Sequence, residues 1–106
     1  MNPLVTPDGR YLIVRGRMWR STNPNLPVDV RAALVCRLMD ARREVKAATL
    51  KQDVDRVAAA RMAVNSAKLS LGERGPVWWT DGKKDFNRYL VKNTPYAEWY
   101  DSLDAP

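Results

Sequence analysis

The chain has 106 residues, of which 45% are apolar and 28% are charged, so its composition predicts one folded domain spanning residues 1–106. It contains no histidine, which excludes the hydrolases that use a Ser/His/Asp or Cys/His arrangement. The net charge of +6 favours contact with nucleic acid or another anionic surface.

No apolar run in the chain approaches the roughly 20 residues that a membrane-spanning helix needs. Cys36 is the only cysteine, so no internal disulfide can form. We therefore expect a cytoplasmic protein without membrane contact.

The first 20 residues predict a short β-strand or hairpin at about residues 10–20. Residues 2–6 read as coil, and Pro7-Asp8-Gly9 is a turn signal. The apolar run Tyr11–Val14 predicts a strand, and residues 17–20 could form a second one after Gly16.

Two long helices are expected in the middle of the chain, at about 27–50 and 53–71. Apolar residues recur there at steps of three and four. Asp53 is a favourable N-cap for the second helix, and Gly72 is typical of the residue that follows a helix. The short connection predicts an antiparallel helical hairpin, although one continuous helix of about 45 residues is the alternative.

The C-terminal part predicts two short helices, at about 85–92 and 95–102. Asp85 can cap the first, in which Phe86, Tyr89 and Leu90 share a face. Thr94-Pro95 has the cap-then-proline order that begins the second. The expected fold class is therefore mainly α, with a small N-terminal β element.

The nine aromatic residues lie only in the two ends of the chain, before residue 21 and after residue 77. One interpretation is that the ends fold back together and form an aromatic cluster against the helices. The other is that some rings stay exposed as a binding platform, with Trp78 and Trp79 the best candidate pair.

Arg15-Gly16-Arg17, with Arg10 and Arg20 nearby, forms a basic cluster in the N-terminal segment. Arginines next to aromatic rings suit phosphate contact and base stacking. The alternative is that these arginines solvate a strand edge and discourage edge-to-edge pairing. The candidate binding surface consists of Arg15, Arg17, Trp19, Arg20, Trp78 and Trp79.

Two functional hypotheses follow. The first is a non-catalytic interaction module that forms a homodimer or is a subunit of a small assembly, because Val35 and Met39 widen the apolar surface of the first long helix. The second is a nucleic-acid-binding protein that uses the Arg10–Arg20 cluster and the nearby rings. An enzyme comes third, and we expect no catalytic, cofactor-binding or metal-binding residues.

Four phrases of the sequence carry a resemblance to a known family. They are PDGRY at residues 7–11, VRGRMWR at 14–20, GERGPVWWTDG at 72–82 and NTPYAEWY at 93–100. With these phrases the chain resembles a family of short uncharacterised bacterial proteins. The resemblance covers almost the whole chain and implies no particular activity, cofactor or partner.

Overall fold

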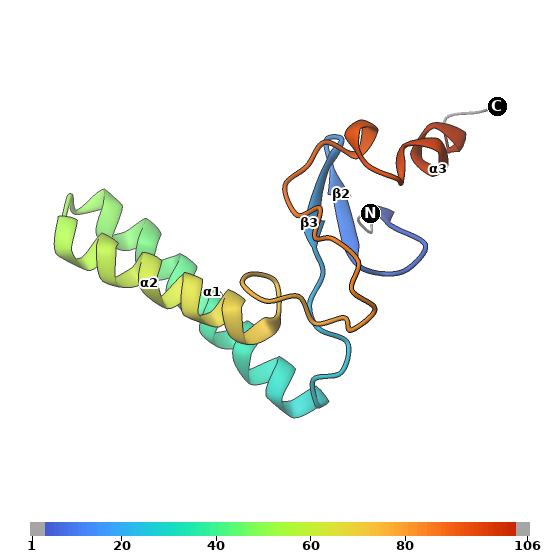
Figure 1. Cartoon of the computed structure of the whole chain (residues 1–106). Coiled ribbons are helices and arrows are strands. Elements are labelled where there is room, and N and C mark those ends of the chain that lie inside the picture. The colour runs from blue at the N-terminus through green and yellow to red at the C-terminus, as the bar shows by residue number, and fades with distance from the viewer. Residues whose placement is uncertain (1–3, 104–106) are drawn as a thin grey trace. The chain divides into compact units, whose positions relative to one another are not determined.

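The computed structural model describes residues 4–103 (Figure 1). In chain order its elements are strands β1 (Leu4–Val5), β2 (Tyr11–Val14) and β3 (Arg17–Arg20), helices α1 (Val28–Leu50) and α2 (Val54–Leu71), the 3-10 helix η1 (Val91–Asn93) and helix α3 (Ala97–Ser102). The predicted mainly helical fold is confirmed. Among the described residues, no helix is both long and apolar enough to cross a membrane.

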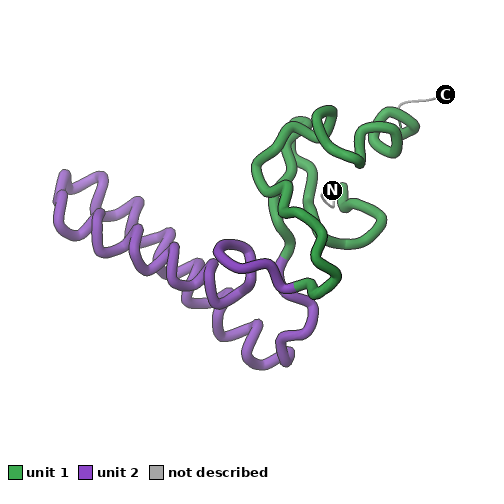
Figure 2. The backbone as a smooth tube through the Cα atoms, viewed as in Figure 1, with its two compact units in different colours: residues 1–21, 79–106 green, residues 22–78 purple. Residues whose placement is uncertain are grey.

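The chain forms two compact units, which Figure 2 colours separately. The helical unit consists of residues 22–78, and the sheet unit consists of the described parts of residues 1–21 and 79–106. The two ends of the sequence thus belong to one unit.

The helical unit is the predicted hairpin of α1 and α2 (Figure 1). The chain breaks at Lys51–Asp53, where Gln52 has a left-handed φ of 55°. Asp53 caps α2 as predicted, because its carboxylate accepts a hydrogen bond of 3.1 Å from the backbone N–H of Arg56. Gly72 ends α2 with a φ of 81°, the conformation that favours glycine at this position.

The larger buried side chains of the hairpin lie at the end where α1 begins and α2 finishes. Leu34, Leu38, Ala67 and Leu71 form the cluster, with Leu26 and Val64 packed against it. Nearer the connecting loop, the buried residues are alanines, among them Ala48 and Ala60. The loop end of the hairpin therefore lacks a core of large side chains.

The sheet unit contains a three-stranded antiparallel sheet in the order β1-β2-β3. The predicted hairpin is confirmed, with Val14 opposite Arg17. Leu4 and Val5, which the sequence placed in coil, pair with Ile13 and Leu12, so that prediction was wrong for these two residues. The predicted turn at residues 7–9 returns the chain antiparallel, since the backbone N–H of Thr6 donates to the Tyr11 carbonyl.

One face of this sheet carries the core of the unit. Tyr11, Ile13, Met18 and Arg20 are all buried there, as the alternation of a strand requires. The Tyr11 ring makes edge-on contacts of 5.7 Å, between centroids, with both Trp79 and Tyr96. The two ends therefore fold together and bury the Tyr11 and Trp79 rings, in a unit that contains neither α1 nor α2.

The predicted helix over residues 85–92 was wrong. This segment is irregular up to η1, and Arg88 has a left-handed φ of 73° that no α-helix accommodates. Its backbone bonds to β3 instead: the Arg88 N–H donates to the Met18 carbonyl, and the Met18 N–H donates to the Tyr89 carbonyl. Tertiary pairing thus overrides the local pattern, whereas the second predicted helix is present as α3 and begins two residues later.

Candidate functional site

The turn between β2 and β3 holds an arginine in a backbone conformation that arginine rarely adopts. Arg15 has a φ of 53° and Gly16 a φ of 77°, and these two residues alone connect the strands. Two positive φ angles define a type I′ turn, whose first position strongly favours asparagine, aspartate or glycine. Arginine at this position therefore costs conformational energy that asparagine or glycine would avoid.

A second arginine occupies an equally unfavourable position. Residues 86–89 form a β-turn in which the Tyr89 N–H donates to the Phe86 carbonyl at 3.0 Å, and Arg88 is its third residue. A positive φ at that position favours glycine or asparagine. The sheet unit thus contains two exposed arginines, each where a glycine or an asparagine would be less strained.

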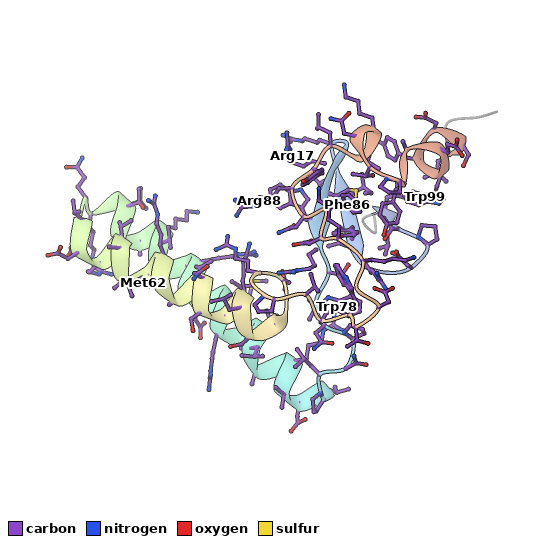
Figure 3. The ribbon with its side chains drawn as sticks, in the orientation of Figure 1. Arg17, Met62, Trp78, Phe86, Arg88 and Trp99 are labelled. Carbon is purple, nitrogen blue, oxygen red and sulfur yellow. The ribbon has the colours of Figure 1, made fainter. Side chains whose placement is uncertain are left out.

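Pairing of the C-terminal segment with β3 places the second turn beside Met18 of that strand and Val91 beside the first turn. Arg17 forms a β-bridge with Leu90, and the Val91 N–H donates to the Gly16 carbonyl at 2.8 Å. The Arg17 guanidinium donates to the carbonyl oxygen of Arg88. Figure 3 shows Arg17 and Arg88 on the same side of the sheet unit.

Trp19 lies on the exposed face of the same sheet. It is two residues from Arg17 on β3, so both side chains lie on the face opposite the core. The Trp19 residue is 39% exposed, and its cross-strand neighbour is Leu12. We call the exposed set Arg15, Arg17, Trp19 and Arg88 the arginine–tryptophan edge.

The charges of this edge are not neutralised within the described residues. No ion pair joins Arg15, Arg17 or Arg88 to a carboxylate of residues 4–103. Lys92, also exposed, follows Val91 beside the first turn. The edge can therefore offer several cations and one indole ring to an anionic partner.

Arg20 and Arg10, predicted to belong to the same cluster, have structural roles. The Arg20 side chain is 1% exposed and donates to Asp85 at 3.3 Å, so it stabilises the unit from within. Arg10 pairs with Asp81 at 2.5 Å and lies over the Trp79 ring, 4.7 Å from its centroid. The Asp81 hydrogen bond raises the pKa of Arg10, and the same bond lowers the pKa of Asp81.

The two adjacent tryptophans belong to different units. Trp79 is buried in the sheet unit, where its indole N–H donates to the Lys83 carbonyl at 2.9 Å. Trp78 is half-buried in the helical unit beside Gly72. Of the six predicted surface residues, the structure therefore brings together Arg15, Arg17 and Trp19.

The sequence-based prediction did not include Arg88 and Lys92 in the candidate surface, because it placed both in a short helix at about 85–92. The available signal was a turn: Asp85 and Asn87 favour turns, and the Asp85 carboxylate accepts the backbone N–H of Asn87 at 3.0 Å. No residue pattern near this turn indicates that it pairs with β3.

A separate groove of about 410 Å³ lies in the sheet unit, lined by Asp8, Arg10, Lys83, Lys84, Phe86, Pro95 and Tyr96. The Tyr96 hydroxyl donates to Asp8 at 2.5 Å. Burial would raise the pKa of Asp8, but hydrogen bonds from Tyr96 and Thr6 hold it below its ordinary value. Lys84 lies over the rings of Phe86 and Tyr89, so part of its charge faces aromatic surface.

Within residues 4–103 there is no group of three or more histidine, cysteine or acidic side chains arranged to hold a metal ion. No protein-family model, curated protein or solved structure matches this chain.

Proposed function

We propose that this protein binds single-stranded nucleic acid without catalysing a reaction, through the arginine–tryptophan edge. The observation that carries the proposal is the placement of arginine at two left-handed positions, Arg15 and Arg88. Strained residues of this kind persist where the surrounding structure holds them and where function uses them. A turn with no role in binding gains nothing from arginine there.

The chemistry of the edge suits an unpaired strand. Guanidinium groups bind phosphate oxygens in a bidentate manner, and an exposed indole can stack on a base. Stacking of one base on an aromatic side chain contributes about 1–3 kcal/mol and tolerates any sequence. Bases within a duplex are already stacked, so Trp19 favours single strands.

Edge protection explains the arginines less well. Charged residues often prevent a free strand edge from pairing with another molecule. Here the Met18 N–H and carbonyl of β3 are already bonded to the segment around Tyr89. The hydrogen-bonding side of β3 that Arg17 would protect is therefore already paired with another segment of the same chain.

Tryptophan fluorescence tests the proposal directly. We expect a 12-nucleotide oligo(dT) to quench the emission of the wild-type protein at low salt. Replacing Trp19 with Phe should abolish the quenching, whereas the matched control Trp99→Phe, in α3, should retain it. Quenching that survives in Trp19→Phe, or no binding at 50 mM salt, would refute the proposal.

The arginines are tested by the salt dependence of the same binding. Each phosphate contact with a single strand contributes about 0.7 to the slope of log affinity against log salt. The double variant Arg17→Ala/Arg88→Ala should therefore lower the slope by roughly 1.4. Lys83→Ala/Lys84→Ala removes the same charge from the separate groove and should change the slope much less.

A second candidate function is self-association through the loop end of the helical hairpin. An apolar groove of about 360 Å³ lies there, lined by Thr49, Gln52, Val54, Val57, Ala58 and Arg61. Val54, which lines it, and Leu50 at the end of α1 are each 78% exposed. The chain itself supplies both the groove and the projecting side chains, as a symmetric contact between two copies requires.

The charges at this loop end also fit a second copy. Lys51 and Asp55 are both exposed there, so a two-fold arrangement can place each near its opposite in the other copy. The contact is small, and small contacts make weak dimers. Light scattering at high concentration should show a dimer that Leu50→Glu disrupts. Val28→Glu, at an exposed apolar residue at the far end of α1, should leave the dimer intact. A strict monomer at high concentration would exclude this candidate.

We also propose a cytoplasmic location, since nucleic acid is present there. The free cysteine, Cys36, is exposed, and a reducing compartment keeps such thiols reduced. Fractionation of cells that express the protein should recover it with the cytoplasmic fraction, and recovery outside that fraction would contradict the proposal.

A further inference from the structure

The charges of the helical hairpin are segregated on two faces. One groove of about 380 Å³ is lined by Arg42 and Val45 of α1, Arg61 and Val64 of α2, and Arg74 beyond it. No acidic residue lines this groove. We call this surface the basic face.

The opposite face of the hairpin has a different character. Its groove, of about 460 Å³, is lined mainly by alanines and serines, together with Leu34, Arg37 and the carboxylate of Asp40. The carboxylate of Glu44 forms an ion pair of 2.5 Å with Arg56 of α2. Helical spacing therefore separates the acidic residues of α1 from its cations on the basic face.

Further cations extend the basic face along both helices. Arg31 and Lys46 lie about three turns and one turn from Arg42 on α1, and Lys68 lies two turns from Arg61 on α2. Residues at these spacings share a helix face. The result is a stripe of like charge that follows the long axis of the hairpin.

We infer that the basic face is a second nucleic-acid interface, one that binds the phosphate backbone of a duplex. This inference rests on the proposed function, in that it takes nucleic acid as the partner. The groove has no aromatic lining residue, so it offers guanidinium groups to phosphates and no ring for base stacking. A contact made only to phosphates does not need unpaired bases.

The side chains of the groove fit this partner. Arg74 is held by a hydrogen bond of 2.9 Å from its guanidinium to the Asn65 side-chain oxygen, which orients one cation in advance. Arg42 and Arg61 are exposed, so their guanidinium groups can reach phosphates at little desolvation cost. Val45 and Val64 provide an apolar floor against which the sugars of a strand can lie.

The probe is a 20-base-pair DNA duplex in an electrophoretic or fluorescence-anisotropy assay. Each duplex phosphate contact contributes about 0.9 to the salt slope, so the three arginines of the groove alone predict about a 40-fold loss of affinity between 50 and 200 mM salt, and contacts from the further cations add to it. The double variant Arg42→Ala/Arg61→Ala removes two contacts, so its loss over that range should be about 12-fold smaller. The control Arg37→Ala/Arg43→Ala removes the same charge and should behave like the wild type.

The outcomes separate this inference from the proposed function. Duplex binding that the double variant weakens, and that Trp19→Phe leaves unchanged, supports the basic face. The inference is wrong if Arg42→Ala/Arg61→Ala and the control Arg37→Ala/Arg43→Ala bind the duplex equally well. It is also wrong if the protein does not bind the duplex while oligo(dT) still quenches Trp19. Both results leave the proposed function standing. Binding to vesicles with 30% anionic lipid but not to the duplex would also overturn it, because the partner would then be a membrane surface.

Discussion

Replacing Arg15 with Asn should raise the stability of the protein while weakening its binding to single strands. Arg15 has a φ of 53° in a type I′ turn, a conformation that favours asparagine, aspartate or glycine. Arg15 forms no ion pair with a carboxylate of the described residues, so the substitution removes no stabilising charge contact. Relief of the backbone strain should add about 0.5–1 kcal/mol to the free energy of unfolding.

The number of phosphate contacts determines how steeply the affinity for a single strand falls with salt, and Arg15→Asn should remove one contact. If Arg15, Arg17 and Arg88 each contact one phosphate, the salt slope is roughly 2.1 and the affinity falls about 18-fold between 50 and 200 mM salt. Arg15→Asn leaves two contacts, so the affinity should fall about sevenfold over the same range. The two readouts, stability and affinity, move in opposite directions.

Thermal unfolding and oligo(dT) binding measure the two effects on the same preparation. A gain of about 0.5–1 kcal/mol corresponds to roughly 2–8 °C in Tm for a chain of this size. Arg15→Lys keeps both the charge and the strain, so it should leave both readouts near the wild type. If Arg15→Asn stabilises the protein and leaves binding unchanged, the strain at Arg15 has no role in binding.

Three further predictions concern stability. Gly72→Ala should destabilise the hairpin by about 2 kcal/mol in chemical denaturation, because an added Cβ would stand 2.9 Å from the Asn23 Cβ at a φ of 81°; an unchanged midpoint would contradict this. Asp85→Ala should cost about 3 kcal/mol in the same assay, since it removes a carboxylate that faces the buried Arg20 guanidinium; a loss below about 1 kcal/mol would mean that this pair is not important. Asp81 has a lowered pKa, so the stability it provides is complete above about pH 4 and is lost as the pH falls below that value. The difference between urea midpoints at pH 7 and pH 3 should therefore be smaller in Asp81→Asn than in the wild type.

The helical half of the fold could be predicted because its signals are local. The apolar spacing, the Asp53 cap and the Gly72 C-terminus lie within a few residues of the structure they specify. Strand alternation over residues 11–20 likewise predicts the hairpin. The segment at residues 85–92 could not be predicted in this way, because its backbone bonds reach β3, about 70 residues away in sequence.

The candidate site was predictable only in part for the same reason. In β3 the sequence reads Arg-Met-Trp-Arg, and the two arginines lie on opposite faces of the strand. Only the position of the core decides that Arg20 is buried and Arg17 exposed. The contribution of Arg88 depends on a turn whose partner strand the local sequence does not identify.

The position of the arginines, more than their number, supports a binding role. Solubility needs only charge, and exposed positions in α1 and α2 provide it without backbone strain. The buried Arg20 faces a carboxylate, as burial of a charge requires, whereas the two strained arginines face none within residues 4–103. Positive φ at Arg15 and Arg88 fixes their backbones beside the strand that presents Trp19. A ligand with a negatively charged backbone and flat aromatic rings uses all of these groups at once, and a single strand of nucleic acid has both.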